Sequence, residues 1–156
     1  MKSLPEIDLS SIYAMGDGDN IRQRIEREVL HGNVDACRRV SGEISVAMDR
    51  VRCLALATTG CEVVFCGGDD ILLRIDRKAY SPTLVRRMMS EFEHASGLTM
   101  CFGVADTLVE AYLNLRKAKA SGYGVLVTCD VDDLDTARCS SPRADLRLAR
   151  DMTNDS

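Results

Sequence analysis

Two acidic motifs contain the side chains best suited to chemistry in this chain. Gly16-Asp17-Gly18-Asp19-Asn20 follows a short apolar run, and Gly67-Gly68-Asp69-Asp70 lies between two longer apolar runs. If both motifs meet at one edge of a sheet, Asp17, Asp69 and Asp70 converge, and clustered carboxylates stay ionised together only when a cation joins them. Oxygen-rich sites without histidine suit Mg²⁺ or Mn²⁺, which can hold the attacking and leaving oxygens of a phosphoryl displacement.

Each motif alone also has a simpler interpretation. Two apolar runs about a Gly-Gly pair are typical of a β-hairpin, since glycine tolerates the positive φ of a type I′ turn. The first motif is most simply a loop with a helix cap, so Asp19 and Asn20 either face a ligand or cap the helix, with capping favoured for Asn20. It also resembles the start of an EF-hand loop, but the required glutamate does not follow. Both motifs together, each at a strand end, favour a metal site.

The overall charge argues against large anionic partners. The 156 residues include 24 acidic and 20 basic side chains, which gives a net charge of −4. Such a chain lacks the broad basic surface that binds duplex nucleic acid or an anionic membrane directly. Aromatic residues make up only 4%, without tryptophan, so stacking platforms for single-stranded nucleic acid are scarce.

The cysteines and the start of the chain indicate a cytoplasmic protein. The seven cysteines include no CxxC pair, and the first residues do not resemble a signal or transit peptide. We therefore expect reduced thiols that serve as small apolar core residues. With only two histidines, a histidine-rich zinc site is not expected.

The apolar pattern predicts a β-α-α-β-β-α-β-α-β order, in which strands and helices alternate with caps and glycines. This is a single α/β (α+β) domain of the palm or ferredoxin-like βαββαβ type, with about five strands and helices on the sheet faces. Both hairpin runs are nearly continuous, which predicts two central strands. The domain is expected to span residues 1–130, and residues 131–156 to form a peripheral or disordered tail. The expected strands are 11–15, 61–66, 69–75, 98–104 and 125–129.

Four helices are expected between these strands. The first has its face marked by Ile21, Ile25 and Val29, and the second runs from about 34 to 57. Ser81-Pro82 begins the third, and Thr107 with Glu110 forms a capping box for the fourth. The expected buried faces of the third and fourth helices are Leu84, Val85, Met88, Met89 and Phe92, and Leu108, Ala111, Tyr112, Leu115 and Ala118.

The two acidic motifs resemble the palm domain shared by GGDEF nucleotide cyclases and type III CRISPR polymerase subunits. The run YAMGDGDNI at residues 13–21 is most similar to the minimal CRISPR polymerase family. A third marker is FGVA at residues 102–105, followed by AKASG at residues 118–122, which matches the AKxxG segment of these families. The resemblance covers residues 11–129.

The resemblance implies a role for each motif residue. Asp17, with the backbone carbonyl of Gly18, would be the first metal ligand, and Asp69 and Asp70 would complete a catalytic metal pair. Lys119 would contact the triphosphate, its alternative being a solvated lysine at a helix end. Nucleotide-binding residues would be Gly18, Asp19, Asn20, Gly67, Gly68 and Lys119, since the glycines let backbone approach a triphosphate.

The function implied by the resemblance is Mg²⁺-dependent condensation of ATP into a cyclic di- or oligonucleotide signal for antiphage defence, with release of pyrophosphate. A homodimer and a downstream effector that senses the nucleotide are also implied. At the position of Ile25 the GGDEF cyclases carry an asparagine that reads guanine, so adenine is expected here. Glu26 follows it, and Tyr123 stands where a basic residue is common. The alternatives are a non-catalytic nucleotide sensor on the same fold and, ranked last, an RNA-binding domain.

Overall fold

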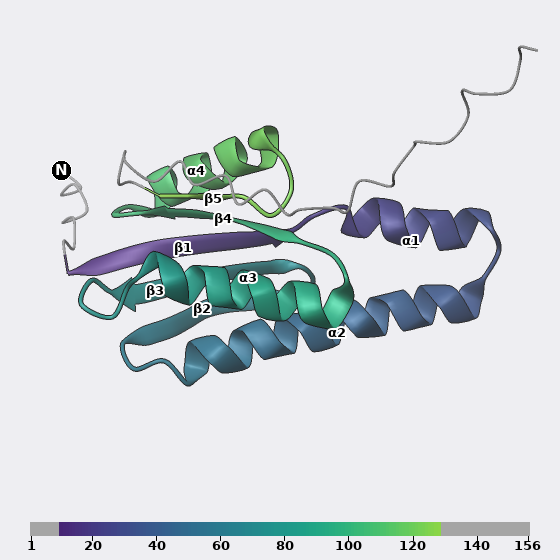
Figure 1. The fold of residues 1–156 in the computed structure, drawn as a ribbon, viewed down its shortest axis with the longest axis horizontal. Helices are drawn as coiled ribbons and strands as arrows, with labels where there is room; N and C mark the ends of the chain where they lie inside the picture. Colours follow the sequence, from purple (N-terminus) through teal and green to yellow (C-terminus); the bar gives the residue numbers. More distant parts are fainter. Residues whose placement is uncertain (1–9, 129–156) are drawn as a thin grey trace, which may run out of the picture.

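The computed structural model describes residues 10–128, which form a five-stranded sheet with helices on both faces (Figure 1). The sheet order is β2-β3-β1-β4-β5, so the first strand of the chain lies at its centre. The palm-like α/β fold and the predicted element order are confirmed. The elements are β1 (Ser11–Gly18), α1 (Ile21–Leu30), α2 (Val34–Leu56), β2 (Cys61–Gly67), β3 (Asp70–Asp76), α3 (Pro82–Ser96), β4 (Met100–Ala105), α4 (Leu108–Ser121) and β5 (Leu126–Val127).

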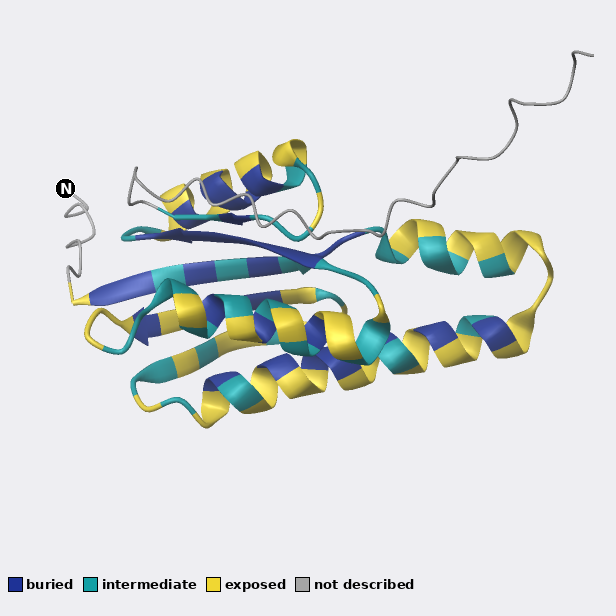
Figure 2. Ribbon diagram, in the orientation of Figure 1, coloured by how far each residue is buried: buried dark blue, intermediate teal, exposed yellow. Residues whose placement is uncertain are grey.

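Two layers of helix cover the sheet. On one face, α2 and α3 pack side by side and bury a core that includes Val51, Val85 and Phe92 (Figure 2). On the other face, α4 covers β4 and β5 around Cys101, Leu115 and Ala118. Because side chains alternate along a strand, neighbouring residues of β4 serve opposite cores. The sheet is therefore held from both sides where β1 and β4 pair.

The predicted β-hairpin of β2 and β3 is confirmed, but only one of its two strands is central, as both were predicted to be. β3 lies between β2 and β1, and Ile71, Leu73 and Ile75 are fully buried. β2 is an edge strand whose register shifts between Val63 and Phe65, and Phe65 remains 45% exposed. A bulge of this kind breaks the inward and outward alternation. The continuous apolar run of β2 thus reflects the bulge rather than a central position.

The helix predictions hold with corrections to α1 and α4. Asn33, Ser81 and Thr107 each accept a capping hydrogen bond at the start of α2, α3 and α4, as the capping patterns of the last two predict. In α1 no residue is fully buried, because this helix extends past the end of the sheet (Figure 1). In α4, Leu108 and Tyr112 are 44% and 49% exposed, so their predicted burial is wrong.

The side chain of Asn114 explains the α4 correction. Asn114 lies in the buried face of the helix and donates a hydrogen bond of 2.9 Å to the backbone carbonyl of Val104. A polar residue in this position satisfies a backbone acceptor of the sheet. The buried stripe of α4 consequently runs through Ala111, Asn114, Leu115 and Ala118.

The ends of the last two strands also differ from expectation. β4 begins at Met100 rather than residue 98, because the backbone of Leu98 is hydrogen-bonded to the Ser96 hydroxyl in a turn. β5 is limited to two residues that pair in parallel with β4. The expected tail at 131–156, Cys129 and Cys139 lie outside the described residues.

The expectation that the cysteines are small core residues holds for Cys101, which is buried, and is wrong for Cys53, which is exposed. Cys37, Cys53, Cys61, Cys66 and Cys101 are all free. Burial raises the pKa of both Cys61 and Cys101 to about 11, which disfavours the reactive thiolate. Within residues 10–128, no helix combines the length and the apolar character that a membrane span requires.

Gly103 in β4 allows α4 to rest directly on the sheet. A Cβ at this position would lie 2.0 Å from the backbone nitrogen of Leu115 and 2.3 Å from the carbonyl oxygen of Ala111. These are backbone atoms of a helix, so no side-chain rotation can relieve the overlap. The close approach sets the position of α4, the helix that carries Lys119.

We expect Gly103→Ala to lower the free energy of unfolding by about 3 kcal/mol, because the added methyl group must displace α4 from β4. Urea denaturation followed by circular dichroism measures the change. The matched control is Gly42→Ala in α2, where no atom lies within 4 Å of the new Cβ. That control should be stabilised by about 0.5–1 kcal/mol. A Gly103→Ala protein as stable as the wild type would contradict the close packing.

Candidate metal and nucleotide site

The central strand continues through the first acidic motif. β1 ends at Gly18 rather than at Met15, so Asp17 is a strand residue and lies directly opposite Asp70 of β3. The N–H of Gly18 donates a 3.0 Å hydrogen bond to the carbonyl of Asp69. Glycine and aspartate predicted a strand end, but pairing with strands on both sides overrides this local preference. The sheet register itself therefore brings the two motifs together.

Gly16 is required for this extension. A Cβ at Gly16 would lie 2.6 Å from the ring of Phe102, which is fully buried against β1. The ring fills the space where a side chain would stand and supports the strand just before Asp17. The glycine that appeared to end the strand is thus a packing position within it.

The predicted convergence of the three carboxylates is confirmed. One carboxylate oxygen from each of Asp17, Asp69 and Asp70 lies within 4.8 Å of the others. Burial, followed by the charge of Asp17, raises the pKa of Asp69. Burial, a hydrogen bond with Asp17 and the neighbouring charges raise the pKa of Asp70 to about 6. The negative charges therefore oppose one another, and an all-oxygen cluster of this kind fits Mg²⁺ or Mn²⁺.

The turn that carries Asp69 differs from the expected type. Gly67 ends β2 and Asp70 begins β3, so Gly68 and Asp69 form the turn. Gly68 has a φ of 62°, whereas Asp69 is not among the residues with positive φ. A type I′ turn requires positive φ at both positions, so that prediction is wrong; a positive φ at the first position alone is typical of type II′. Gly67 and Gly68 keep the space beside the carboxylates free of side chains.

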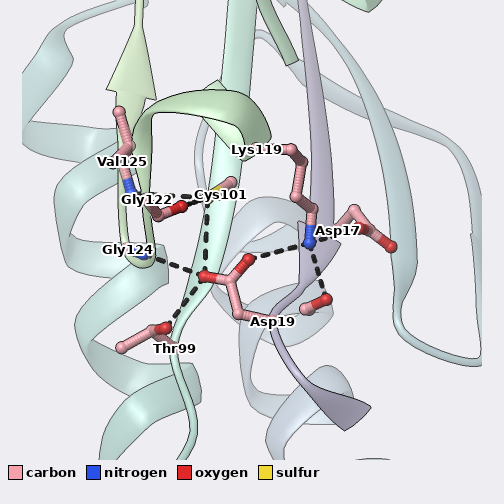
Figure 3. Close-up of polar contacts among 9 residues, drawn as sticks. Asp17, Asp19, Thr99, Cys101, Lys119, Gly122, Gly124 and Val125 are labelled. Atoms are coloured by element: carbon pink, nitrogen blue, oxygen red, sulfur yellow. Dashed lines mark hydrogen bonds and ion pairs between the residues drawn. The ribbon is translucent and has the colours of Figure 1, made fainter. Parts of the chain in front are cut away.

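Asp19 has a structural role that neither sequence interpretation anticipated. Its side chain is 3% exposed and accepts 2.8 Å hydrogen bonds from the Thr99 hydroxyl and the Gly124 N–H (Figure 3). The Cys101 thiol donates a third bond of 3.4 Å. Asp19 thus joins the end of β1 to the start of β4 and to the loop before β5. Asn20 is at the N-cap of α1 in a left-handed conformation, but its side chain makes no capping bond, so capping by Asn20 is wrong.

Lys119 links this buried aspartate to the carboxylate cluster. Its Nζ donates to Asp19 at 2.8 Å and to the carbonyl of Gly18 at 2.7 Å, and it forms an ion pair with Asp17 (Figure 3). Burial lowers the pKa of Lys119, but the hydrogen bonds and charges of Asp17 and Asp19 outweigh burial and raise the pKa overall. The side chain is only 24% exposed, so the alternative of a solvated lysine is wrong. The AKxxG segment was the signal that pointed to it.

Other supporting residues carried no sequence signal. Thr99 and Gly124 contact Asp19 across separations of 80 and 105 residues, and neither belongs to a recognisable motif. Their role depends on the fold, which brings the start of β4 and the loop before β5 to the end of β1.

One protein family matches most of this chain. The family profile of mCpol, the minimal CRISPR polymerase domain, matches residues 13–129. The chain belongs to the minimal CRISPR polymerase family. The matched range of this mCpol domain contains all three carboxylates, Lys119 and every described strand apart from the first two residues of β1. Among curated protein sequences, none matches this chain.

Solved structures share the fold of this mCpol domain at low sequence identity. The Csm1–Csm4 cassette in complex with cA4 matches with a TM-score of 0.56 and 16% identity, over 78% of this chain and 22% of that chain. The diguanylate cyclase SiaD, in complex with its activator SiaC from Pseudomonas aeruginosa, matches with a TM-score of 0.52 and 20% identity, over 77% of this chain and 50% of that chain. A diguanylate cyclase/phosphodiesterase from Caldicellulosiruptor saccharolyticus gives 0.53 and 15%, over 77% of both chains.

These likenesses concern the fold. The mCpol domain spans half of the SiaD chain and 22% of the Csm1–Csm4 chain it matches. The family match makes it a minimal CRISPR polymerase domain, and the solved structures share its fold.

The raised pKa of Asp70 gives a stability prediction for the metal-free domain. Between the ordinary value of 3.8 and about 6, the folded domain binds more protons at Asp70 than the unfolded chain, so its stability falls as pH rises through this window. Asp70→Asn keeps a donor for the hydrogen bond with Asp17 but removes the charge. Because Asp70 is exposed, solvent screening limits the gain at pH 7.5 to about 1 kcal/mol.

Thermal unfolding in a chelating buffer measures this gain. We expect the stabilisation by Asp70→Asn to be largest above pH 6 and to vanish near pH 3.8, where the wild-type carboxyl is also neutral. A gain that stayed constant across this pH range would show that charge repulsion is not its cause.

Proposed function

We propose that this domain is a Mg²⁺- or Mn²⁺-dependent nucleotidyltransferase that condenses ATP into a cyclic di- or oligonucleotide and releases pyrophosphate. The observation that carries the proposal is the convergence of Asp17, Asp69 and Asp70 within a family of minimal polymerases. The structural likeness to diguanylate cyclases and to a Csm1–Csm4 cassette holding cA4 supports a nucleotide product. We extend the proposal to a palm domain at residues 1–130 that acts in the cytoplasm.

We assign a role in the reaction to each side chain from its position in the site. Asp17, Asp69, Asp70 and the carbonyl of Gly18 would hold the metal, which supplies stabilisation of the attacking ribose oxygen and of the leaving pyrophosphate. The ribose hydroxyl of one ATP attacks the α-phosphorus of the other, the bond to pyrophosphate breaks, and the hydroxyl proton passes to solvent. Lys119 lies against Asp17 and Gly18, where its ammonium group can offset phosphate charge.

The first turn of α1 also suits a polyphosphate. It contains no acidic residue, and Asn20 leaves the N-terminal N–H groups without a side-chain cap. Such a helix start carries a partial positive charge and free N–H donors. Gly67 and Gly68 have no side chains, so the backbone at the turn between β2 and β3 can approach the nucleotide closely.

Three further parts of the proposal concern specificity and partners. Ile25 cannot hydrogen-bond a guanine edge, so we propose that ATP is preferred over GTP. Two nucleotide-loaded copies would face each other in a homodimer, because each phosphodiester bond joins the ribose hydroxyl of one nucleotide to the α-phosphate of another. The product would act through a separate effector in antiphage defence, with neither nucleic acid nor membrane bound directly by this domain.

Turnover with single nucleotides tests the proposal. The purified protein is incubated with Mg²⁺ and each of the four ribonucleoside triphosphates, and pyrophosphate and phosphatase-resistant products are measured, the latter by mass spectrometry. We expect a cyclic adenylate product from ATP and none with a chelator. Tight nucleotide binding without turnover in any mixture would favour the non-catalytic sensor. A strong preference for GTP would overturn the argument from Ile25.

A further inference from the structure

A pocket beside α1 is not used by the carboxylate chemistry. Its volume is about 340 Å³, near the lower end of the range of about 300–1,000 Å³ typical of small-ligand sites. It is lined by Asn20, Gln23, Arg24, Arg27, Leu98 and Tyr123. The N-cap residue Asn20 and the three residues from α1 follow the spacing of one helix face, and none of the six is acidic.

The pocket adjoins the metal site through Asp19. Asn20 follows Asp19 in the chain, Leu98 precedes Thr99, and Tyr123 precedes Gly124. Thr99 and Gly124 each donate a 2.8 Å hydrogen bond to the Asp19 carboxylate. The junction at Asp19 therefore fixes three walls of the pocket, while Lys119 connects the same carboxylate to Asp17.

The arginines of the pocket carry charge that the domain does not neutralise. The Nε of Arg24 is buried and has no hydrogen-bond partner. Among residues 10–128, neither Arg24 nor Arg27 pairs with a carboxylate, whereas Arg22 of the same helix bonds Glu26 at 2.7 Å. A buried guanidinium nitrogen without an acceptor is unfavourable, and a guanidinium fork matches the oxygens of phosphate.

We infer that this pocket binds the terminal phosphates of a nucleoside triphosphate whose α-phosphate lies at the carboxylate cluster. The inference rests on the proposed function for the identity of the ligand and goes further by naming the phosphate-binding residues. Arg24 and Arg27 hold the end of the substrate that leaves as pyrophosphate. The pocket is then a subsite that distinguishes triphosphates from monophosphates.

A bound base is the competing occupant. Tyr123 is 66% exposed and could stack on a base, and the amides of Asn20 and Gln23 could read its edge. Two unpaired guanidinium groups favour an anion over a neutral base. A phosphate and a base would lose different amounts of binding affinity when the arginines or the tyrosine are replaced.

Binding measurements without turnover test the inference. Isothermal titration gives the Kd of ATP, AMP and inorganic tripolyphosphate, each with Mg²⁺, for the full chain and for Arg24→Gln, Arg27→Gln and the double variant. We expect the double variant to bind ATP and tripolyphosphate about 10- to 100-fold more weakly, and AMP within about twofold of the wild type. Arg22→Gln removes the same charge from the same helix outside the pocket and should bind all three ligands as the wild type does.

Other outcomes would overturn the inference. One is an unchanged affinity for ATP in the double variant, and another is no binding of tripolyphosphate by the wild type. A third is an equal loss of affinity for AMP and ATP in the double variant that Tyr123→Ala reproduces, which would indicate a base site. Arg27 is exposed, so Arg27→Gln alone keeps the test decisive if replacement of Arg24 impairs folding. Arginine-dependent tripolyphosphate binding in a protein without turnover would refute the proposed function but support this subsite.

Discussion

Replacing Asp69 and Asp70 together with asparagine is expected to lower the rate of nucleotide condensation by at least about 10³-fold. The amides keep the size of the side chains but remove the negative charges that would bind a divalent cation, so Asp17 is left as the last charged ligand of the cluster. Pyrophosphate release at saturating ATP and Mg²⁺ measures the loss. The double variant should fold, because burial and the charge of Asp17 raise the pKa of both Asp69 and Asp70, so their ionised forms do not stabilise the domain.

The matched control for this experiment is Asp35→Asn. Asp35 lies in the first turn of α2, where its side chain is 90% exposed and, within residues 10–128, pairs only with Arg38. Its replacement should leave the rate within about twofold, since surface ion pairs contribute little. Persistent turnover in the Asp69/Asp70 double variant would show that other groups carry the reaction.

Asp19→Ala should produce a large loss of stability, comparable to that of Gly103→Ala. Asp19 is 3% exposed and accepts hydrogen bonds from Thr99, Gly124 and Lys119. Its removal leaves a buried N–H and a hydroxyl without their acceptor and takes one of two carboxylates from Lys119. We expect a decrease of about 3 kcal/mol in the free energy of unfolding, at the lower end for a broken buried ion pair because Asp17 remains.

Urea denaturation of two variants separates the contributions at this junction. Thr99→Val removes one of the hydrogen bonds to Asp19 and should cost about 1 kcal/mol. Asp19→Ala should also weaken ATP binding, because the same junction holds Leu98 and Tyr123 in the pocket walls. If Asp19→Ala and Thr99→Val lowered the free energy of unfolding by the same small amount, the junction would not be centred on the Asp19 carboxylate.

The motifs predict the carboxylate cluster because its members are close to strand ends in the chain. Asp17 and the Asp69-Asp70 pair each follow a recognisable apolar run, and topology alone then brings them to one edge. The element order and the caps of α3 and α4 are also predictable, because the residues that determine them are neighbours in the chain. Local patterns also explain the error at β1. Its glycines predict that the strand ends at Met15, but β1 continues because it pairs with β3 on one side and β4 on the other.

The parts that sequence reasoning missed are contacts between distant segments. Asp19 lies within the first acidic motif, yet its partners come from the start of β4 and the loop before β5. Arg24 and Arg27 lie on a helix with an ordinary charged composition, and only the fold places Leu98 and Tyr123 opposite them. Residue type gave no sign that Asn114 would replace an apolar side chain in the buried face of α4.

The acidic residues of this region consequently divide into two kinds. Asp19 is a buried structural anion, satisfied by donors from three segments. Asp17, Asp69 and Asp70 are partly exposed and close together, and the raised pKa values of Asp69 and Asp70 show that their ionised forms are unfavourable without a cation. Residues that reduce stability at a functional site are typical of selection for activity. Lys119 contacts both kinds and couples the structural junction to the candidate metal site.

The most direct test of the account is the location of the metal. Crystals of the wild type and of the Asp69→Asn/Asp70→Asn variant, grown with Mn²⁺ and a non-hydrolysable ATP analogue, allow the metal to be placed by its anomalous scattering. We predict an anomalous peak among Asp17, Asp69 and Asp70 in the wild type, in contact with the phosphates, and no such peak in the variant. An analogue bound elsewhere, or without metal at these three carboxylates, would contradict the account.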